Sequence, residues 1–332
     1  MEYSDRKRML WKLAVLVAIL VSSVLSCQPA PSPEETTSPV PSPSPELSSS
    51  PLTSPVDRPD PSPWPSGRVL YHSDQTGTYQ IYLVANGATP AQLTESPFSA
   101  VEPSWSPDGE KISFAAETSE ASGIEIYMME ADGGNKQKVM AEQPRLNWRP
   151  RWSPDGTQLL FQSNRDGNYE VYKVNVDGSS LTNLTNHPSN DRDAAWMPEG
   201  NRIAFVSDRG GGGGNALYLM NEDGSDVTEI LDKSWNCSFP RWSSDGKRIA
   251  FSSKKDGTWD VYTIDADGGD ARKVTDRVGD NVTPAWADDD QLLFSGEAGD
   301  LSWDLFLVNV DGSDLVQLTD TLSSERFPDW AP

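Results

Sequence analysis

The stretch Pro103-Ser-Trp105-Ser-Pro-Asp-Gly109 decides the fold, because it recurs along the chain at an almost constant interval. The complete, degenerate and truncated copies that follow it contain Trp152, Trp196, Trp242, Trp286 and Trp330. The spacings between successive tryptophans are 47, 44, 46, 44 and 44 residues. A fixed period in the forties is typical of the four-stranded blade of a β-propeller.

Each repeat contains four short segments of β-forming residues with turn signals between them. Around Trp152 these segments are Pro150–Trp152, Leu159–Phe161, Val171-Tyr172 and the stretch that ends at Leu184-Thr185. A Pro-Asp-Gly turn joins the first two segments and an Asp-Gly turn joins the last two. Both are strong hairpin signals, because glycine tolerates a positive φ. No segment shows a helical period, so the sequence predicts an all-β protein.

The two ends of the repeat region complement each other. Val69–Tyr71, Ile81-Tyr82 and Leu93-Thr94 match the second, third and fourth strands of a repeat that lacks its first strand. Pro328–Pro332 matches a first strand with nothing after it. We expect this C-terminal strand to pair with the N-terminal strands, because closing the ring removes unpaired sheet edges. The expected fold is a six-bladed β-propeller of four-stranded antiparallel blades over residues 67–332.

The repeat resembles the PD40, or WD40-like, repeat of TolB-like propellers. The resemblance rests on Pro-x-Trp-Ser-Pro-Asp-Gly followed by Ile-x-Phe-x-Ser, Ile-Tyr, Asp-Gly and Leu-Thr, and it covers about 80% of the chain. It implies a six-bladed propeller and is weakly specific for function. TolB, the periplasmic component of the Tol–Pal system, is similar in this region but carries a separate α/β domain before its propeller. In this chain a leader and a Pro/Ser-rich segment occupy that place.

The N-terminal residues predict export and attachment to a membrane. A basic start precedes the apolar run Leu13–Leu25, whose 13 residues are fewer than the about 20 that span a bilayer. Residues 1–26 are therefore expected to be a signal peptide. Val24-Leu25-Ser26-Cys27 resembles a bacterial lipobox, which implies lipidation of Cys27. The alternative is an ordinary signal peptide beside which Cys27 is incidental.

Residues 27–66 are expected to be a lipid-anchor cysteine followed by a disordered tether. Thirteen prolines lie between Gln28 and Ser66, and the segment has too few apolar residues to offset the entropy of ordering it. The predicted location is the outer side of a bacterial membrane, at the cell surface or in the periplasm.

The chain is strongly acidic, and its charge and composition exclude several classes of function. Its 332 residues include 27 Lys+Arg and 50 Asp+Glu, a formal net charge of −23. Nucleic acids reward basic patches, so no nucleic-acid partner is expected. The two cysteines and two histidines exclude a disulfide framework and a Cys/His zinc cluster. No cofactor or metal site is predicted, and calcium held by oxygen ligands at the axis stays open without a supporting Asp-x-Asp-x-Asp loop.

The loops that lead from the fourth strand of one repeat to the first strand of the next carry the candidate binding residues. These loops share one face with the loops between the second and third strands, and variable loops on a rigid scaffold carry function. Aromatic residues beside Arg, Asn and Asp are typical of recognition surfaces. The candidates are Trp148, Arg149, Asp191, Arg192, Trp235, Asn236 and Arg326.

A structural interpretation of the same residues is the alternative. The two tryptophans would then cover blade edges, and the arginines would pair with nearby acids. Packing is also the assignment for the repeated tryptophans and for the aromatic residues that open the third strand in four repeats, Tyr79, Tyr169, Trp259 and Trp303.

We expect a monomeric binding protein or scaffold whose partner is an envelope protein or peptide. A Ser/His/Asp triad is not expected, because only His72 and His187 are available and no Gly-x-Ser-x-Gly motif occurs. The alternative is a carbohydrate-active or other hydrolytic propeller that uses carboxylates on the same face. Residues 67–332 contain 43 acids, which leave many possible pairs.

Overall fold

The computed structural model describes residues 63–118, 123–140, 145–298 and 302–332. The chain divides into two units, Met1–Arg58 and Pro59–Pro332, and all described strands belong to the second. The predicted signal peptide, Cys27 and nearly all of the tether lie outside the described residues. In the described part of the chain, no helix is both long and apolar enough to cross a membrane.

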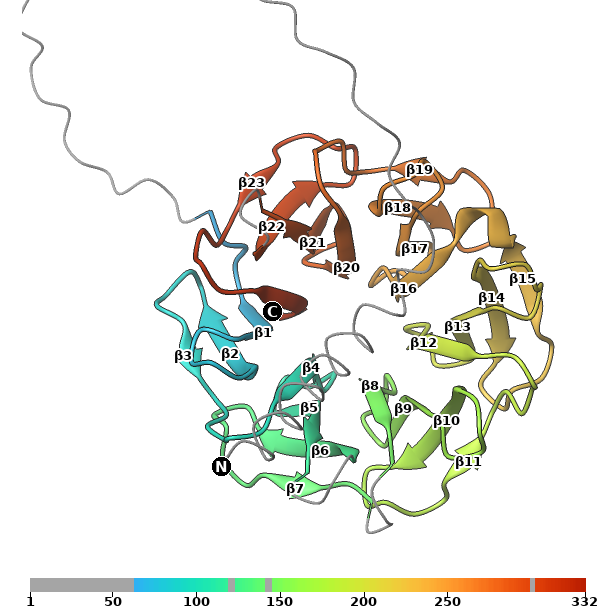
Figure 1. The fold of residues 1–332 in the computed structure, drawn as a ribbon, viewed down its shortest axis with the longest axis horizontal. Helices are drawn as coiled ribbons and strands as arrows, with labels where there is room; N and C mark the ends of the chain where they lie inside the picture. The colour runs from blue at the N-terminus through green and yellow to red at the C-terminus, as the bar shows by residue number, and fades with distance from the viewer. Residues whose placement is uncertain (1–62, 119–122, 141–144, 299–301) are drawn as a thin grey trace, which may run out of the picture. The chain divides into compact units, whose positions relative to one another are not determined.

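Six four-stranded antiparallel sheets form the blades of a propeller (Figure 1). We call the strands of each blade A to D from the centre outward. The A strands are β24 (Glu325–Ala331), β4 (Ala100–Trp105), β8 (Asn147–Trp152), β12 (Asp191–Trp196), β16 (Cys237–Trp242) and β20 (Asn281–Trp286). The B strands are β1 (Arg68–Ser73), β5 (Lys111–Glu117), β9 (Gln158–Ser163), β13 (Arg202–Ser207), β17 (Arg248–Ser253) and β21 (Gln291–Glu297).

The outer strands complete each blade. The C strands are β2 (Gln80–Ala85), β6 (Ile124–Glu130), β10 (Glu170–Asn175), β14 (Ala216–Asn221), β18 (Asp260–Asp265) and β22 (Trp303–Asn309). The D strands are β3 (Ala91–Gln92), β7 (Gln137–Lys138), β11 (Thr182–Asn183), β15 (Thr228–Leu231), β19 (Arg272–Lys273) and β23 (Val316–Gln317). Blade 1 contains β24, β1, β2 and β3, and blades 2 to 6 follow in chain order.

The C-terminal strand β24 closes the ring. It pairs antiparallel with β1, with Ser73 opposite Glu325. On its other side, the backbone N–H of Phe327 donates to Ser295 Oγ in blade 6 at 3.1 Å. The predicted closure by the C-terminal strand is therefore confirmed, and with it the six-bladed fold.

The A strands are longer than the sequence predicts. The repeat pattern limits them to Pro-x-Trp, whereas each contains six or seven residues. Residues that the sequence places in loops therefore lie in A strands: Trp148, Arg149, Asp191, Arg192 and Arg326. The reason is tertiary, because each A strand also contacts the A strands of both neighbouring blades, and no local pattern records those contacts.

Aromatic rings hold the blades together internally and against each other. Phe161 of β9 and Tyr172 of β10 stack with ring centroids 5.7 Å apart, and an equivalent pair occurs in each other blade. The repeated tryptophans lie between blades, as Trp152 illustrates: its indole N–H donates to the carbonyl of Ser104 in blade 2 at 3.2 Å. Aromatic area buried between neighbouring sheets is thus a main stabilising contribution.

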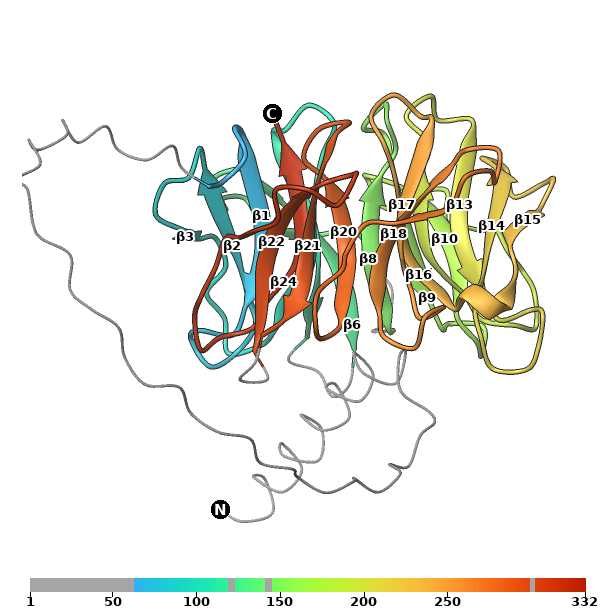
Figure 2. The same cartoon turned by 90° about the horizontal axis from the view of Figure 1, so that it is seen from above.

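The two faces of the ring are built differently (Figure 2). The turn face carries the A–B and C–D turns, such as Asp155-Gly156 and Asp177-Gly178, and the C-terminus. Gly178 has a φ of 82°, and a Cβ there would lie 2.3 Å from the carbonyl oxygen of Val139. The loop face carries the B–C and D–A connections, such as residues 164–169 and 184–190.

Candidate functional site

A bulge in each A strand turns one residue toward the axis of the ring. The register between the A and B strands shifts at this point in every blade. The residue at the bulge has a φ between 55° and 59°, which is uncommon for a residue with a side chain. We call these six residues the axial ring: Glu102, Arg149, Asp193, Phe239, Thr283 and Phe327.

The backbone N–H of every axial-ring residue donates to a side chain of the preceding blade. In four cases the acceptor stands at the fifth position of the preceding B strand. These acceptors are His72 Nδ1, Gln162 Oε1, Ser252 Oγ and Ser295 Oγ, each at 3.1 Å. Burial holds the pKa of the His72 imidazole well below its usual value. His72 is therefore a neutral acceptor that joins two blades.

The acids of the axial ring replace the acceptor where the B strand has none. The fifth B-strand position is apolar in two blades, at Ala115 and Val206. There the N–H of Arg149 donates to the Glu102 carboxylate at 2.8 Å. The N–H of Phe239 donates to the Asp193 carboxylate at 3.1 Å. Glu102 and Asp193 thus join blades in the same way as the histidine, glutamine and serines elsewhere.

Arg149 fills the axis at the level of the axial ring. Its Nε lies 3.4 Å from Glu102, and its Nη1 forms an ion pair with Asp193. The guanidinium carbon lies 4.4 Å from the ring centre of Phe239 and 6.0 Å from that of Phe327. These partners belong to four other blades, so only a central side chain can reach them all. Burial lowers the pKa of Arg149 to about 10, which leaves it charged at neutral pH, and the side chain plugs the channel.

Two further arginines lie on the loop-face side of this plug. Arg192 and Arg326 directly precede axial-ring residues in β12 and β24, and the A strands run from the loop face to the turn face. The guanidinium of Arg192 lies 5.0 Å from the ring centre of Tyr169. That of Arg326 lies 4.2 Å from the ring centre of Trp303. We call these two cation–π contacts the mouth pairs.

The mouth pairs leave hydrogen-bond donors unused. Arg192 and Arg326 each have a buried Nε without a hydrogen-bond partner. Among the described residues, neither has a carboxylate within ion-pair distance, in contrast to Arg149. Burial lowers the pKa of both guanidinium groups. The mouth pairs can therefore bind a carboxylate supplied from outside the chain.

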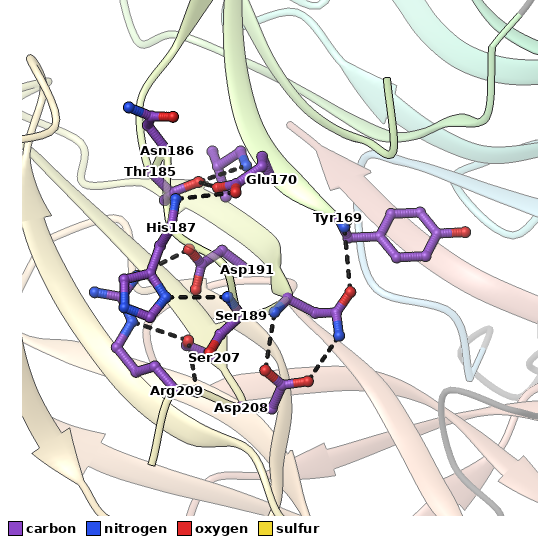
Figure 3. A network of polar contacts seen from close by, with 12 residues as sticks. Tyr169, Glu170, Thr185, Asn186, His187, Ser189, Asp191, Ser207, Asp208 and Arg209 are labelled. Atoms are coloured by element: carbon purple, nitrogen blue, oxygen red, sulfur yellow. Dashed lines mark hydrogen bonds and ion pairs between the residues drawn. The ribbon is translucent and has the colours of Figure 1, made fainter. Parts of the chain in front are cut away.

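Asp191 lies in a separate polar network where blades 3 and 4 meet (Figure 3). Its carboxylate is fully buried and accepts a hydrogen bond from Arg209 Nη2 at 2.8 Å. In the same network, Asn190 binds both carboxylate oxygens of Asp208. The ring of Tyr169 points away from this network in Figure 3. Asp191 thus joins the start of β12 to the B–C connection after β13 and is not part of the mouth pairs.

His187 belongs to the same network through both its ring and its backbone N–H. Its Nδ1 accepts a hydrogen bond from the backbone N–H of Ser189 at 3.1 Å. Its own backbone N–H donates to Glu170 Oε1 at 2.9 Å. Since Nδ1 meets a main-chain donor, His187 does not have the carboxylate-oriented imidazole of a catalytic triad.

The other predicted site residues are parts of blade packing. Trp148 is 6% exposed and lies in the core shared by blades 2 and 3. Trp235 ends the single 3-10 turn assigned in the described chain, Lys233–Trp235, and packs edge-on against Tyr262. Asn236 follows with a φ of 47°, and its Oδ1 accepts from the N–H of Asn215. The structure therefore groups Arg149, Arg192 and Arg326 around the axis and places the other four candidates elsewhere.

Two buried carboxylates of the loop face are bound by hydroxyl groups of the protein. Glu325 accepts from Ser73 Oγ at 2.8 Å and from Thr321 Oγ1 at 3.0 Å. Asp304 accepts from Thr319 Oγ1 at 3.1 Å. Among the described residues, no group of three His, Cys, Asp or Glu side chains is placed to hold a metal ion. Calcium binding and the hydrolytic alternative stay predictions.

Sequence reasoning did not identify the axial ring as a set. Its members are chemically diverse, and the bulge that turns them inward has no residue-type signature. The available signal is a constant offset, because each member stands three residues before a repeat tryptophan. Reading that position in all six repeats would have found the ring.

The six four-stranded sheets define the class of protein, a six-bladed β-propeller. A family model described as "TolB beta propeller domain" (PD40) matches residues 85–332, and the chain belongs to this family.

Individual relatives agree with this assignment. The chain is 30% identical over 147 residues to a protein named TolB homolog from Chlorobium luteolum, which covers 43% of this chain and 32% of that protein. It is 31% identical over 149 residues to the Tol-Pal system protein TolB of Bordetella pertussis, covering 44% and 33%. These matches span about a third of each relative's length. The structure of TolB from Acinetobacter baumannii superposes with a TM-score of 0.68 at 23% identity, covering 80% of this chain and 67% of that chain.

Proposed function

We propose that this protein is a membrane-tethered, extracytoplasmic binding propeller that recognises an envelope protein or peptide through its loop face. The observation that carries the proposal is the two mouth pairs, each a half-buried arginine on an aromatic ring without a carboxylate partner. Arg, Trp and Tyr are the residues that most often dominate binding energy at protein interfaces. Family membership supports a role in the envelope, since one relative is named a Tol-Pal system protein.

The chemistry of the mouth pairs favours an acidic segment of the partner. An aromatic ring holds each guanidinium in one orientation, so little entropy is lost when a carboxylate binds. Because Arg149 fills the axis below them, the partner binds as a loop or a short extended segment at the mouth. It does not thread through the ring.

The test is a pull-down from solubilised host envelope with the purified full chain as bait, followed by cross-linking mass spectrometry. The bait is compared with an Arg192→Met/Arg326→Met variant, in which the aliphatic stems still cover Tyr169 and Trp303. Losing one partner of a buried charged pair costs about 2–5 kcal/mol, so we expect the captured protein to bind the variant at least about 30-fold more weakly.

The matched control is Arg272→Met, whose side chain is 70% exposed and pairs with Asp270. A partner captured equally by wild type and control, lost from the double variant and cross-linked beside the mouth supports the proposal. Equal capture by all three baits, or cross-links confined to the turn face, would refute it.

A further inference from the structure

The turn-face end of the channel contains a cavity separate from the mouth pairs. Its volume is about 250 Å³, and its wall includes arginine, aspartate and repeat tryptophan side chains. No axial-ring residue lines it, because Arg149 and its partners close the channel above. A ligand in this cavity therefore does not meet the loop face.

Two arginines in the cavity wall form no direct ion pair. Arg151 and Arg241 stand two residues after the axial ring in β8 and β16. Each donates through Nη1 to the carbonyl of the proline before it, at 2.8 and 3.2 Å. The Nε of each has no partner, and no carboxylate of the described chain lies within ion-pair distance of either. Arg151 is only 7% exposed, and it feels the buried Asp329 carboxylate at longer range without forming a direct ion pair with it.

Burying an unpaired charge is costly. Taking an ion out of water costs several kcal/mol unless an opposite charge compensates. One layer above, Glu102 and Asp193 compensate the buried charge of Arg149. Asp191 does the same for Arg209. Arg151 has only the longer-range attraction of Asp329 and Glu102, and an anion in the cavity would give both Arg151 and Arg241 a direct partner.

The tryptophans add flat apolar walls and further donors. In two blades the indole N–H donates to the preceding blade, from Trp152 to Ser104 and from Trp286 to Arg241. In three others, at Trp105, Trp196 and Trp242, the indole N–H has no partner. The same three tryptophans line the cavity. Its wall thus combines indole faces with an excess of donors over acceptors.

The charge of the wall limits the ligand. Asp329 is the acid among the lining residues, and it already accepts the backbone N–H of Trp105 at 2.8 Å. The side chains of the wall, two arginines and one aspartate, carry a net charge of +1 when all are ionised, and Pro332, whose α-carboxylate is a further negative charge, also lines the cavity. The ligand therefore carries no more than a single negative charge.

We propose that this cavity binds a small monocarboxylate with a flat apolar body, held by Arg151 and Arg241 and stacked against the repeat tryptophans. A carboxylate matches the planar fork of a guanidinium. The indole walls favour a ring or another flat group beside it. The site lies on the opposite face from the mouth pairs and does not depend on the proposed partner.

The test uses three probes of one shape and different charge: benzoate, benzamide and benzamidine. Each is titrated into the purified full chain at pH 7 by isothermal calorimetry, with tryptophan fluorescence as a second readout, since indoles line the site. A ligand of benzoate's size reaches a Kd of about 1 mM. We expect saturable benzoate binding with a fluorescence change, at least about tenfold weaker binding of benzamide, and none of benzamidine.

The matched variants are Arg151→Met and Arg241→Met, which keep the side-chain stems, with exposed Arg272→Met as the control. The first two are expected to abolish benzoate binding and the control to keep it. If a variant fails to fold, the comparison of benzoate, benzamide and benzamidine binding to the wild type still tests the proposal. Absence of saturable benzoate binding, equal binding of benzoate and benzamide, or benzoate binding retained in folded Arg151→Met and Arg241→Met variants would each overturn the proposal.

Discussion

Glu102 and Ser252 are equivalent hydrogen-bond acceptors, although they stand in different strands of their blades. Each accepts a hydrogen bond from the axial-ring N–H of the next blade, Glu102 from β4 and Ser252 from β17. A buried backbone N–H without an acceptor costs about 1–3 kcal/mol. The need for an acceptor is therefore fixed by the fold, whereas the residue that supplies it can change.

This substitution can be tested with a rescue. Glu102→Ala removes the acceptor of the Arg149 N–H, so we expect a loss of about 2–4 kcal/mol in the free energy of unfolding. Adding Ala115→Ser places a hydroxyl where blades 5 and 6 carry Ser252 and Ser295, and it should recover about 1 kcal/mol. The measurement is equilibrium urea denaturation of wild type, both single variants and the double variant. If Ala115→Ser stabilises the wild type by as much as it stabilises the Glu102→Ala variant, the two positions are not coupled.

Glu325 makes stability depend on pH. Burial is the main cause that raises the pKa of its carboxyl from 4.5 to about 7, and the nearby Asp304 carboxylate adds to it. Between these values the unfolded chain releases a proton that the folded chain retains. Stability from this group is therefore complete below about pH 4.5 and is lost as pH rises to about 7.

Glu325→Gln should remove this loss. At pH 8 we expect the melting temperature of the variant to exceed that of the wild type by on the order of 5 °C, since 1 kcal/mol corresponds to about 2–4 °C in a protein of this size. At pH 4.5 the two should melt together. Differential scanning calorimetry across this range is the measurement, with the exposed Glu110→Gln as the control. A difference that is the same at both pH values would argue against the titration of Glu325.

At the scale of the elements, strand β24 holds the ring closed. It supplies the A strand of blade 1, whereas the other three strands of that blade, β1 to β3, come from the opposite end of the propeller sequence. Its two neighbours along the ring both bind it, through the Phe327 N–H to Ser295 and through Asp329 to the Trp105 N–H. Removing it exposes an unpaired edge of β1 and opens both junctions.

Deletion of residues 325–332 should therefore destabilise the whole propeller. The buried Phe327 alone contributes about 2–3 kcal/mol, and we expect a total loss of at least about 4 kcal/mol once the lost hydrogen bonds are added. Thermal melting of the truncated and full chains is the measurement. A peptide of residues 325–332 added in trans should raise the melting temperature of the truncated chain, because an extended peptide can add to a free edge. An unchanged melting temperature of the truncation would contradict the closing role of β24.

At the scale of the whole molecule, the charge is unevenly distributed. The chain carries a net charge of −23, yet both ends of its channel contain buried or half-buried arginines that form no direct ion pair. The field of the acidic surface is screened beyond about 8 Å at physiological ionic strength. We therefore expect these arginines to act at short range, on groups that come into contact with the axis.

The repeat pattern was sufficient to predict the overall architecture. The spacing of the tryptophans predicted six blades, and the incomplete first and last repeats predicted closure, which β24 and β1 confirm. Both features are periodic, and periodic features can be read without knowledge of the third dimension. The candidate site was predicted less well. Arg192 and Arg326 lie at the mouth, whereas Trp148 and Asp191, chosen by the same reasoning, are buried in blade packing and in an ion pair.

The sequence by itself therefore determined the order of the strands, the number of blades and the strand that closes the ring, because hydrophobic alternation and turn residues act locally, whereas the full length of the A strands depended on contacts between blades. Only the tertiary structure decided which side chains meet at the axis. The bulge at Arg149 turns its guanidinium toward residues of four other blades, and their separations in sequence carry no signal of that meeting. Which arginines find acids and which stay unpaired depends on distances across the ring, which exist only once the ring is closed.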